Sequence, residues 1–168
     1  LQALYLALGL IDERVDLYSL YAEMLEEQVR GTFDPETKEL YLLKGAAEEL
    51  ILVHETVHAL QQQHFDILAE RSDASYNLDQ KLAFSALVEG DATLATRLYQ
   101  ESEFQHAVGG VDTPIFDNAP PIVQTSLTFP YLHGTEFVSR LWDIDQSWTA
   151  VNAAYVSPPQ STTYHALG

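Results

Sequence analysis

The stretch Ala46–Ala69, AAEELILVHETVHALQQQHFDILA, decides the fold of this chain. It contains neither Pro nor Gly, and its apolar residues recur at spacings of three and four. These periodic positions are Leu50, Val53, Val57, Leu60 and Ile67. The pattern predicts a helix of about six turns with one buried face. We therefore expect this helix to be the central element of the molecule.

Further elements are predicted on both sides of this helix. Helical patterns cover residues 12–27, with Asp12 as N-cap, 79–106, ended by Gly109-Gly110, 123–127, 130–142 and 146–155. Asp34-Pro35 is typical of a turn, and it separates short extended pieces at 29–33 and 39–43, which predicts a β-hairpin. The expected fold class is therefore mainly α (α+β), a helical domain with a small hairpin beside the central helix.

The composition indicates the class of molecule. The chain has 168 residues, of which 46% are hydrophobic, and it carries 8 Lys+Arg against 25 Asp+Glu, a net charge of -17. A chain of this length suits a single domain, residues 1–168, with a proper core. The acidity argues against partners that present phosphate, whether nucleic acid or an anionic membrane surface.

Two further features of the composition limit what the chain can be. The longest apolar run, Leu4–Ile11, is far shorter than the roughly 20 residues that a bilayer requires, so no membrane span is expected. The chain has no Cys, which excludes disulfides and thiolate sites. It opens on Leu1 rather than Met, so we expect a chain trimmed at one or both ends.

The central helix carries the residues that point to chemistry, His54-Glu55-Thr56-Val57-His58. Histidines at i and i+4 project from one helix face, so both imidazoles can reach a single ion, and Glu55 stands beside them. This HExxH spacing is typical of a catalytic zinc site. The alternative is a histidine pair that is solvated or hydrogen-bonded on a helix surface.

A third ligand is expected, because catalytic zinc commonly takes three protein ligands. Glu89 on the second long helix is the candidate. Gly90 beside it costs about 1 kcal/mol relative to Ala in a helix, which a close approach of the two helices would explain. The alternative is a packing glycine beside a solvated glutamate. Asp91 lies about 200° around the helix from Glu89, so we do not expect it to be a ligand.

These residues resemble a known family. His54-Glu-Thr-Val-His58 with Glu89-Gly90 downstream resembles the gluzincins, zinc metallopeptidases with a HExxH helix and a glutamate ligand on a following helix. More narrowly, three blocks are similar to a group of small, largely uncharacterised bacterial gluzincin-like domains: Gly31–Pro35, Val53–Asp66 and Val88–Thr93. Two weaker similarities follow, at Pro130–Gly134 and Pro158–Thr162.

The resemblance implies a hydrolase of peptide bonds in a zincin-like fold. His54, His58 and Glu89 would hold Zn²⁺, and Glu55 would act as general base on the attacking water. The strand at 39–43 would offer its edge to an extended peptide or protein substrate. The resemblance also implies an extracytoplasmic protein, secreted or anchored to a membrane in its full-length form.

The reaction also needs a hydrogen-bond donor for the charge that develops on the carbonyl oxygen. Our choice is Tyr131, with His133 and then Tyr155 as alternatives. Gln62, four residues after His58, is a candidate to support the site, whereas His64 and His106 are assigned to structure or solvent.

Two other functions remain open at this stage. The first is a di-iron carboxylate bundle, because Glu55-x-x-His58 and Glu103-x-x-His106 both fit its signature. Against it, Glu89 and Glu103 are about 21 Å apart along one predicted helix, too far to share a metal pair. The second is a non-catalytic or latent metal-binding interaction module. The retention of Glu55 favours activity over this second possibility.

Overall fold

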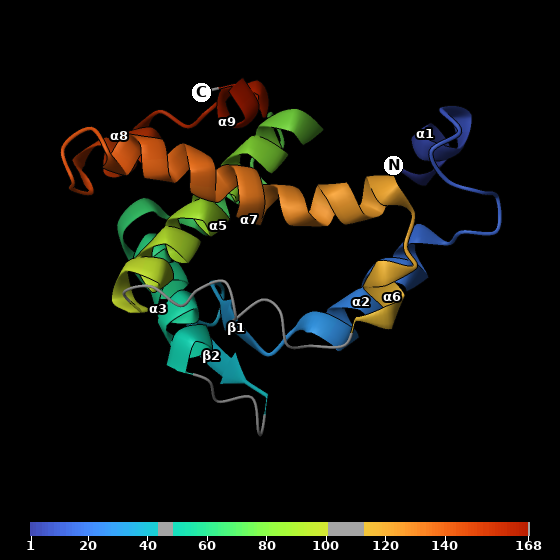
Figure 1. Ribbon diagram of the computed structural model, residues 1–168, viewed down its shortest axis with the longest axis horizontal. Helices are drawn as coiled ribbons and strands as arrows, with labels where there is room; N and C mark the ends of the chain where they lie inside the picture. The colour runs from blue at the N-terminus through green and yellow to red at the C-terminus, as the bar shows by residue number, and fades with distance from the viewer. Residues whose placement is uncertain (44–48, 101–112, 168) are drawn as a thin grey trace. The chain divides into compact units, whose positions relative to one another are not determined.

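The computed structural model describes residues 1–43, 49–100 and 113–167 (Figure 1). Its helices are α1 (Gln2–Ala7), α2 (Leu17–Gln28), α3 (Glu49–Phe65), α4 (Ile67–Ser72), α5 (Leu78–Gln100), α6 (Pro114–Asp117), α7 (Pro121–Trp142), α8 (Thr149–Val156) and α9 (Thr163–Leu167). The strands β1 (Gly31–Asp34) and β2 (Glu39–Leu42) form an antiparallel hairpin. The predicted class, mainly α with a small hairpin, is confirmed.

The chain divides into two compact units. The described residues of unit 1 are 1–29 and 113–128, and those of unit 2 are 30–43, 49–100 and 129–167. The division falls inside α7, next to Pro130. Proline lacks the N–H that a helix donates to the carbonyl four residues earlier, so the division coincides with a missing helical hydrogen bond. Despite Pro130, α7 is continuous, whereas two separate helices were predicted there.

Unit 1 has its own apolar core. Its buried members are Ile11, Leu17, Met24, Ala119 and Val123. The helix α2 begins after Asp16, whose carboxylate accepts hydrogen bonds from the backbone N–H groups of Tyr18 and Ser19. Asp12, the predicted N-cap, instead forms an ion pair with Arg14 at 2.9 Å. The predicted start of this helix at Asp12 is therefore wrong.

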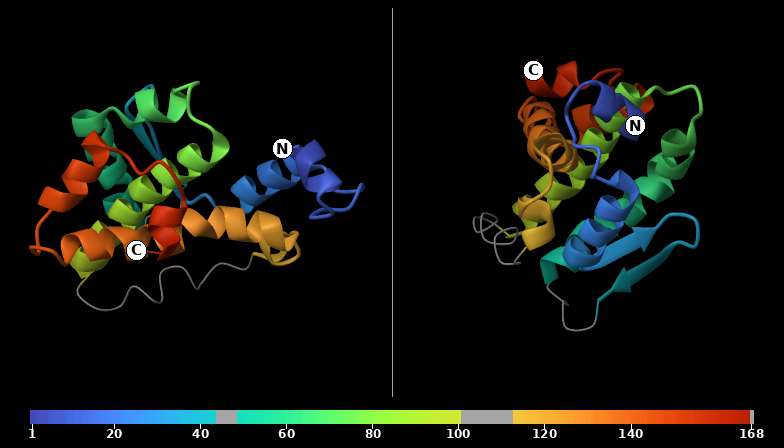
Figure 2. Two further views of the ribbon diagram at one scale, coloured as in Figure 1. Left: turned by 90° about the horizontal axis from the view of Figure 1, so that it is seen from above. Right: turned by 90° about the vertical axis from the view of Figure 1, so that its right-hand side faces the viewer.

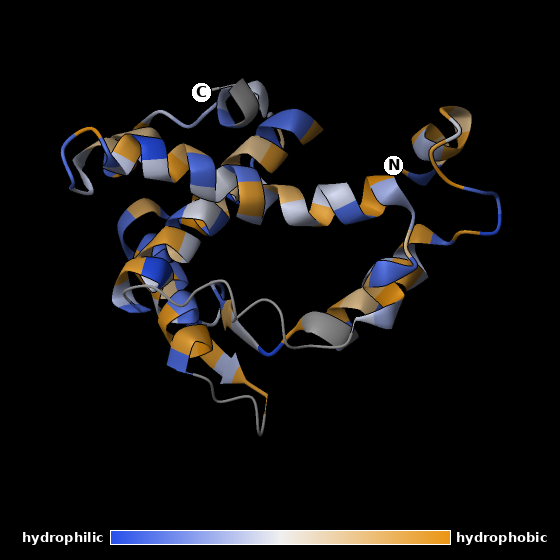
Figure 3. Ribbon diagram, viewed as in Figure 1, coloured by the Kyte–Doolittle hydropathy of each residue, from blue (hydrophilic) through white to orange (hydrophobic). Residues whose placement is uncertain are grey.

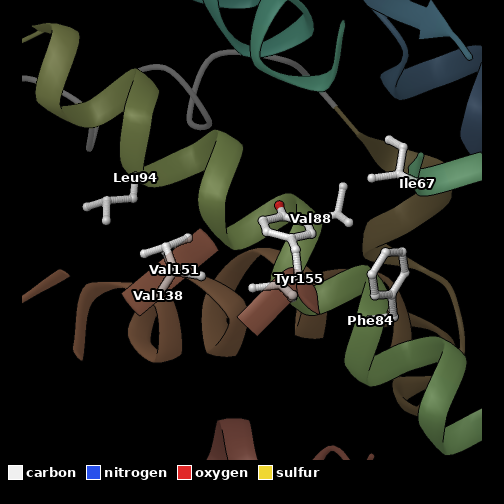
Figure 4. Packing of buried hydrophobic residues seen from close by; sticks show 8 residues of the cluster. Ile67, Phe84, Val88, Leu94, Val138, Val151 and Tyr155 are labelled. Atoms are coloured by element: carbon white, nitrogen blue, oxygen red, sulfur yellow. The ribbon is translucent and has the colours of Figure 1, made fainter. Parts of the chain in front are cut away.

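Unit 2 contains the second core, to which α4, α5, α7 and α8 contribute (Figure 4). Its buried members are Ile67, Phe84, Leu87, Val88, Leu94, Val138, Val151 and Tyr155. Full burial of each large apolar side chain stabilises the fold by about 1.5–3 kcal/mol. Figure 3 shows hydrophobic and hydrophilic residues in alternating bands along α5 and α7. The middle of α5 is buried on all sides, since residues 86–88 and 90–94 are all buried.

The helices α5 and α7 cross in direct backbone contact (Figure 1). A Cβ on Gly90 would lie 2.2 Å from the carbonyl carbon of Gly134, and a Cβ on Gly134 would lie 2.1 Å from the carbonyl oxygen of Ala86. The glycine next to Glu89 therefore serves a close approach to α7, not the expected approach to the central helix.

The predicted central helix is interrupted at Asp66. This residue adopts the left-handed conformation (φ 50°, ψ 55°), which divides the stretch into α3 and α4. The side chain of Gln62 stabilises the break, because its Nε2 donates to Asp66 Oδ1 (2.8 Å) and its Oε1 accepts from the backbone N–H of Leu68 (3.0 Å). The predicted start at Ala46 and the predicted helical residues 101–106 lie outside the described residues.

The hairpin lies beside α3 (Figure 2). Its register pairs Gly31 with Leu42 and Phe33 with Leu40. A Cβ on Gly31 would lie 2.7 Å from the side chain of Ile51, so the glycine lets β1 approach α3 closely. Within the described ranges, no helix is both long and apolar enough to cross a membrane.

Candidate metal centre

The three predicted metal ligands come together in unit 2. His54 and His58 lie one turn apart on α3, and Glu89 reaches them from α5. Glu89 Oε2 is 3.3 Å from the Nε2 atoms of both histidines, and these two nitrogens are 3.1 Å apart. Within the part of the chain that the structure describes, these residues form the group of side chains that could share an ion.

The size of this triangle fits a zinc ion. Zinc binds nitrogen and oxygen at about 2.0–2.2 Å, usually with tetrahedral geometry, and such bonds place neighbouring ligand atoms about 3.3 Å apart. The three side chains are also shielded, with exposed fractions of 19% for His54, 12% for His58 and 15% for Glu89. Two neutral imidazoles and one carboxylate are a ligand set that zinc accepts.

The charge on Glu89 is strongly stabilised. Burial opposes its ionisation, but the hydrogen bonds from His54 and His58 outweigh burial and hold the pKa of Glu89 well below its usual range. For His58, burial favours the neutral ring, whereas Glu89 and Gln61 raise its pKa overall. Without an ion, hydrogen bonds from the two histidines therefore stabilise the ionised carboxylate of Glu89.

Arg71 of α4 holds the second oxygen of Glu89. Its Nη2 lies 3.3 Å from Glu89 Oε1, while Oε2 faces the histidines. The two oxygens thus have different partners, which favours coordination through Oε2 alone. Nothing in the sequence marked Arg71, because it follows the break at Asp66 that periodicity did not predict.

Glu55 lies beside the triangle and is tied to the hairpin. Its residue is 9% exposed, and its Oε2 accepts a 2.7 Å hydrogen bond from the backbone N–H of Phe33 in β1. The other carboxylate oxygen is the one left to act on a water molecule. The strand that reaches Glu55 is β1, whereas the strand predicted to offer its edge to a substrate is β2.

Tyr131 of α7 borders the same site. Its ring stacks against that of His54, with centroids 6.4 Å apart, and the residue is 48% exposed. The charge of Glu89, burial of the phenol and the charge of Glu55 raise the pKa of Tyr131, so its hydroxyl stays protonated as a donor. Both its position and its protonation state suit the predicted donor role.

The two alternatives to Tyr131 have other partners. His133 lies 3.3 Å from Glu136 on its own helix and packs against Phe129. Tyr155 is buried, and its hydroxyl donates to Asp91 Oδ2 at 2.8 Å. Burial and the charge of Asp91 raise the pKa of Tyr155 well above its usual value. Of these three side chains, Tyr131 is the one whose ring packs against His54 of the candidate metal centre.

A glutamine supports the site, but it is not the predicted one. Gln61 Oε1 lies 2.8 Å from His58 Nδ1, and Gln61 is 2% exposed. Gln62, the predicted supporter, instead stabilises the break at Asp66. His64 is exposed at the end of α3. Glu103 and His106, on which the di-iron alternative depends, lie outside the described residues.

Comparisons with known proteins identify no relative: no family description matches the sequence, and neither a curated protein nor a solved structure matches the chain.

Proposed function

We propose that this chain is a zinc-dependent peptidase in which His54, His58 and Glu89 hold the ion and Glu55 is the general base. One observation carries the proposal: the Nε2 atoms of both histidines and Oε2 of Glu89 lie 3.1–3.3 Å from one another, beside Glu55. The HExxH spacing and the resemblance to gluzincins support the same assignment.

A bound zinc ion supplies a Lewis acid that polarises a carbonyl and lowers the pKa of a coordinated water from 15.7 to about 7. The protein then has three tasks of its own. Phe33 N–H holds one oxygen of Glu55, which leaves the other to take a proton from the attacking water and to deliver it to the leaving amine. Tyr131 donates its hydroxyl proton in a hydrogen bond to the carbonyl oxygen as negative charge develops there. Arg71 keeps Glu89 in its place as a ligand.

The experiment that tests this function combines metal analysis with cleavage of a peptide library. We expect the wild-type protein to bind one equivalent of zinc and to cleave peptides. Glu55→Gln should retain the zinc and lose at least about 10²-fold in kcat, because it lacks the base. His54→Ala should lose the zinc itself. Thr56→Ala is the matched control, since Thr56 is exposed on the same helix.

Two results would contradict the proposal. One is a wild-type protein that binds zinc and cleaves no member of the library, which would indicate a metal-binding module instead. The other is a Glu55→Gln variant that cleaves as fast as the wild type. A protein that carries two iron atoms and no zinc would favour the di-iron alternative.

A further inference from the structure

A chain of buried hydrogen bonds leads away from the candidate metal centre. It begins at His58 Nδ1, which lies 2.8 Å from Gln61 Oε1. Gln61 Nε2 donates to Asp91 Oδ2 (2.8 Å) and to the backbone carbonyl of Val88 (3.0 Å). The hydroxyl of Tyr155 donates to the same Asp91 oxygen at 2.8 Å. The proposed function uses none of Gln61, Asp91 and Tyr155.

We propose that Asp91, acting through Gln61, is a positioning residue that fixes His58 in the tautomer whose Nε2 can bind a metal ion. The inference rests on the metal centre proposed above and deepens it. Asp91 is not a ligand in this proposal, in agreement with its position on the far side of α5 from Glu89.

The orientation of the Gln61 amide follows from its partners. The Val88 carbonyl and the Asp91 carboxylate are acceptors only, so the NH₂ group of Gln61 must face them. A flipped amide would place Gln61 Oε1 against both of these oxygens without a proton between them. Each buried polar group left unsatisfied in this way costs about 1–3 kcal/mol. With Gln61 only 2% exposed, water cannot replace the lost partners.

The orientation of Gln61 in turn decides the protonation of His58. Because Oε1 is an acceptor, the Nδ1 atom of His58 must carry the proton. A neutral imidazole has one N–H, so in the neutral ring Nε2 holds the lone pair, whereas the hydrogen bond from Nε2 to Glu89 belongs to the protonated ring. Nε2 is also the atom that faces Glu89 and His54. When His58 loses one proton to bind a metal ion, the proton that remains is therefore the one on Nδ1, and the lone pair of Nε2 faces the other two proposed ligands.

Asp91 is itself held in place. Tyr155 and Gln61 both donate to its Oδ2, so this oxygen cannot turn away without the loss of two hydrogen bonds. The ring of Tyr155 is fixed by stacking on Phe65, with centroids 4.2 Å apart and planes inclined by 3°. Metal-binding histidines commonly donate their second N–H to a carboxylate or carbonyl group. Here a glutamine amide stands between the histidine and the carboxylate.

The first arm of the test measures zinc affinity by competition with a chelator, on variants shown to be folded by circular dichroism. Asp91→Leu removes one of the two acceptors that orient the Gln61 amide and leaves only the Val88 carbonyl, so we expect zinc binding to weaken about 10- to 100-fold. Asp91→Asn retains an acceptor oxygen and should stay within about threefold of the wild type. Gln63→Leu is the matched control: it replaces a neighbouring glutamine that is exposed on the same helix.

The second arm needs no variant. Nitrogen-15 NMR of the metal-free wild-type protein, recorded above the pH at which the same spectra show that His58 has become neutral, reports which of its ring nitrogens is protonated. We expect the proton on Nδ1. A proton on Nε2, or a folded Asp91→Leu variant with wild-type zinc affinity, would overturn the inference. If Asp91→Leu fails to fold, the NMR result alone decides.

The failure of this inference can be distinguished from failure of the proposed function. If the wild-type protein binds zinc but does not cleave peptides, the proposed peptidase function is contradicted. The zinc affinity and the NMR measurement still test the positioning role, since neither of them measures cleavage. If the wild-type protein binds zinc with the affinity that Asp91→Leu also has, the positioning role fails and the peptidase proposal stands.

Discussion

Glu89 is the residue on which the candidate site depends most. Its two oxygens have separate partners, the histidine pair on one side and Arg71 on the other. A buried carboxylate with this arrangement is costly unless it is compensated, and here a neighbouring cation and two imidazoles compensate it. The geometry explains why the charge is retained in a unit that also buries a large apolar core.

Tyr131→Phe tests the donor role at the scale of a single residue. The phenol is the group placed to stabilise charge on the carbonyl oxygen, so its loss should lower kcat about 10²-fold and leave KM and zinc content nearly unchanged. Steady-state kinetics with metal analysis would measure this. Leu132→Ala, at the exposed neighbouring position, should behave as the wild type. If Tyr131→Phe has the kcat of the wild type, the donor role is contradicted and the tyrosine serves only to pack against His54.

The pairing of His54 with His58 could be predicted from the sequence, because helical spacing alone places residues i and i+4 together. The choice between Gln61 and Gln62 could not be predicted in this way. Both lie within one turn of His58, and the choice depends on where α3 ends, since Gln62 is needed at the break next to Asp66. Arg71 could not be predicted either, because its direction is set by that same break.

At the scale of elements, the crossing of α5 and α7 depends on the absence of two side chains. Gly→Ala within a helix normally stabilises it by about 1 kcal/mol. At Gly90 or Gly134 we expect the opposite, a loss of more than about 3 kcal/mol, because the new Cβ would overlap backbone that cannot move aside. Urea unfolding would measure the change. As a control, Ala153→Gly on the exposed face of α8 measures the effect of helix propensity alone. A Gly90→Ala variant that is more stable than the wild type would contradict the close crossing.

The packing of α9 makes a prediction for the dependence of stability on pH. His165 is fully buried against Phe137, and its ring nitrogens lack hydrogen bonds of good geometry, although the Ala83 carbonyl weakly favours the charged form. Burial is the largest of the effects that lower the pKa of His165 to about 4; Arg140 and His133 also lower it, whereas Asp79 opposes them.

The sign follows from linkage. Above about pH 6.5 the ring is neutral in both the folded and unfolded states, and the stabilisation is fully present. As the pH falls toward 4, only the unfolded state takes up the proton, so the free energy of unfolding decreases. Between about pH 7 and pH 4.5, His165→Leu should lose less stability than the wild type, by about 2 kcal/mol. Parallel losses in urea titrations of the two proteins would contradict this.

The periodicity of apolar residues is sufficient to predict the long helices, but it is not sufficient to predict where they begin and end. The hairpin and α5 lie close to their predicted ranges. The N-cap of α2 is Asp16 and not the predicted Asp12. Both aspartates precede the helix in the sequence, and only local geometry decides which of them caps it. The break at Asp66 involves a left-handed residue that is neither Gly nor Asn, so the sequence carries no strong sign of it.

At the scale of the whole molecule, a bound ion should couple to the stability of unit 2, since all three ligands lie there. Zinc at about 100 times its dissociation constant adds roughly 2.7 kcal/mol. Removal of the ion with a chelator should therefore lower the Tm of this unit by about 5–10 °C. Scanning calorimetry would measure the shift, and restored zinc should reverse it. The Tm of His54→Ala should not change when the chelator is added. A wild-type Tm that is the same with and without the chelator would contradict the coupling.

The acidic residues that give the chain its net charge of -17 differ in their exposure to solvent. Most acidic residues are exposed, but Glu55 and Asp91 are buried and Glu89 is largely shielded. Composition could not separate these three from the rest, because burial depends on which residues the packed helices bring together. The division into two units was also hidden, since no linker marks it in the sequence.

Each unit is assembled from two separate stretches of chain, and this has a consequence for synthesis on the ribosome. The segment 1–29 emerges on the order of ten seconds before residues 113–128, which complete its core, at the usual pace of translation. Its apolar surface must remain covered by other means during that interval. The three ligands also emerge before Tyr155, which holds the residue that orients His58. Nascent chains therefore carry the three proposed ligands well before they carry Tyr155, whose hydrogen bond to Asp91 completes the buried chain behind His58.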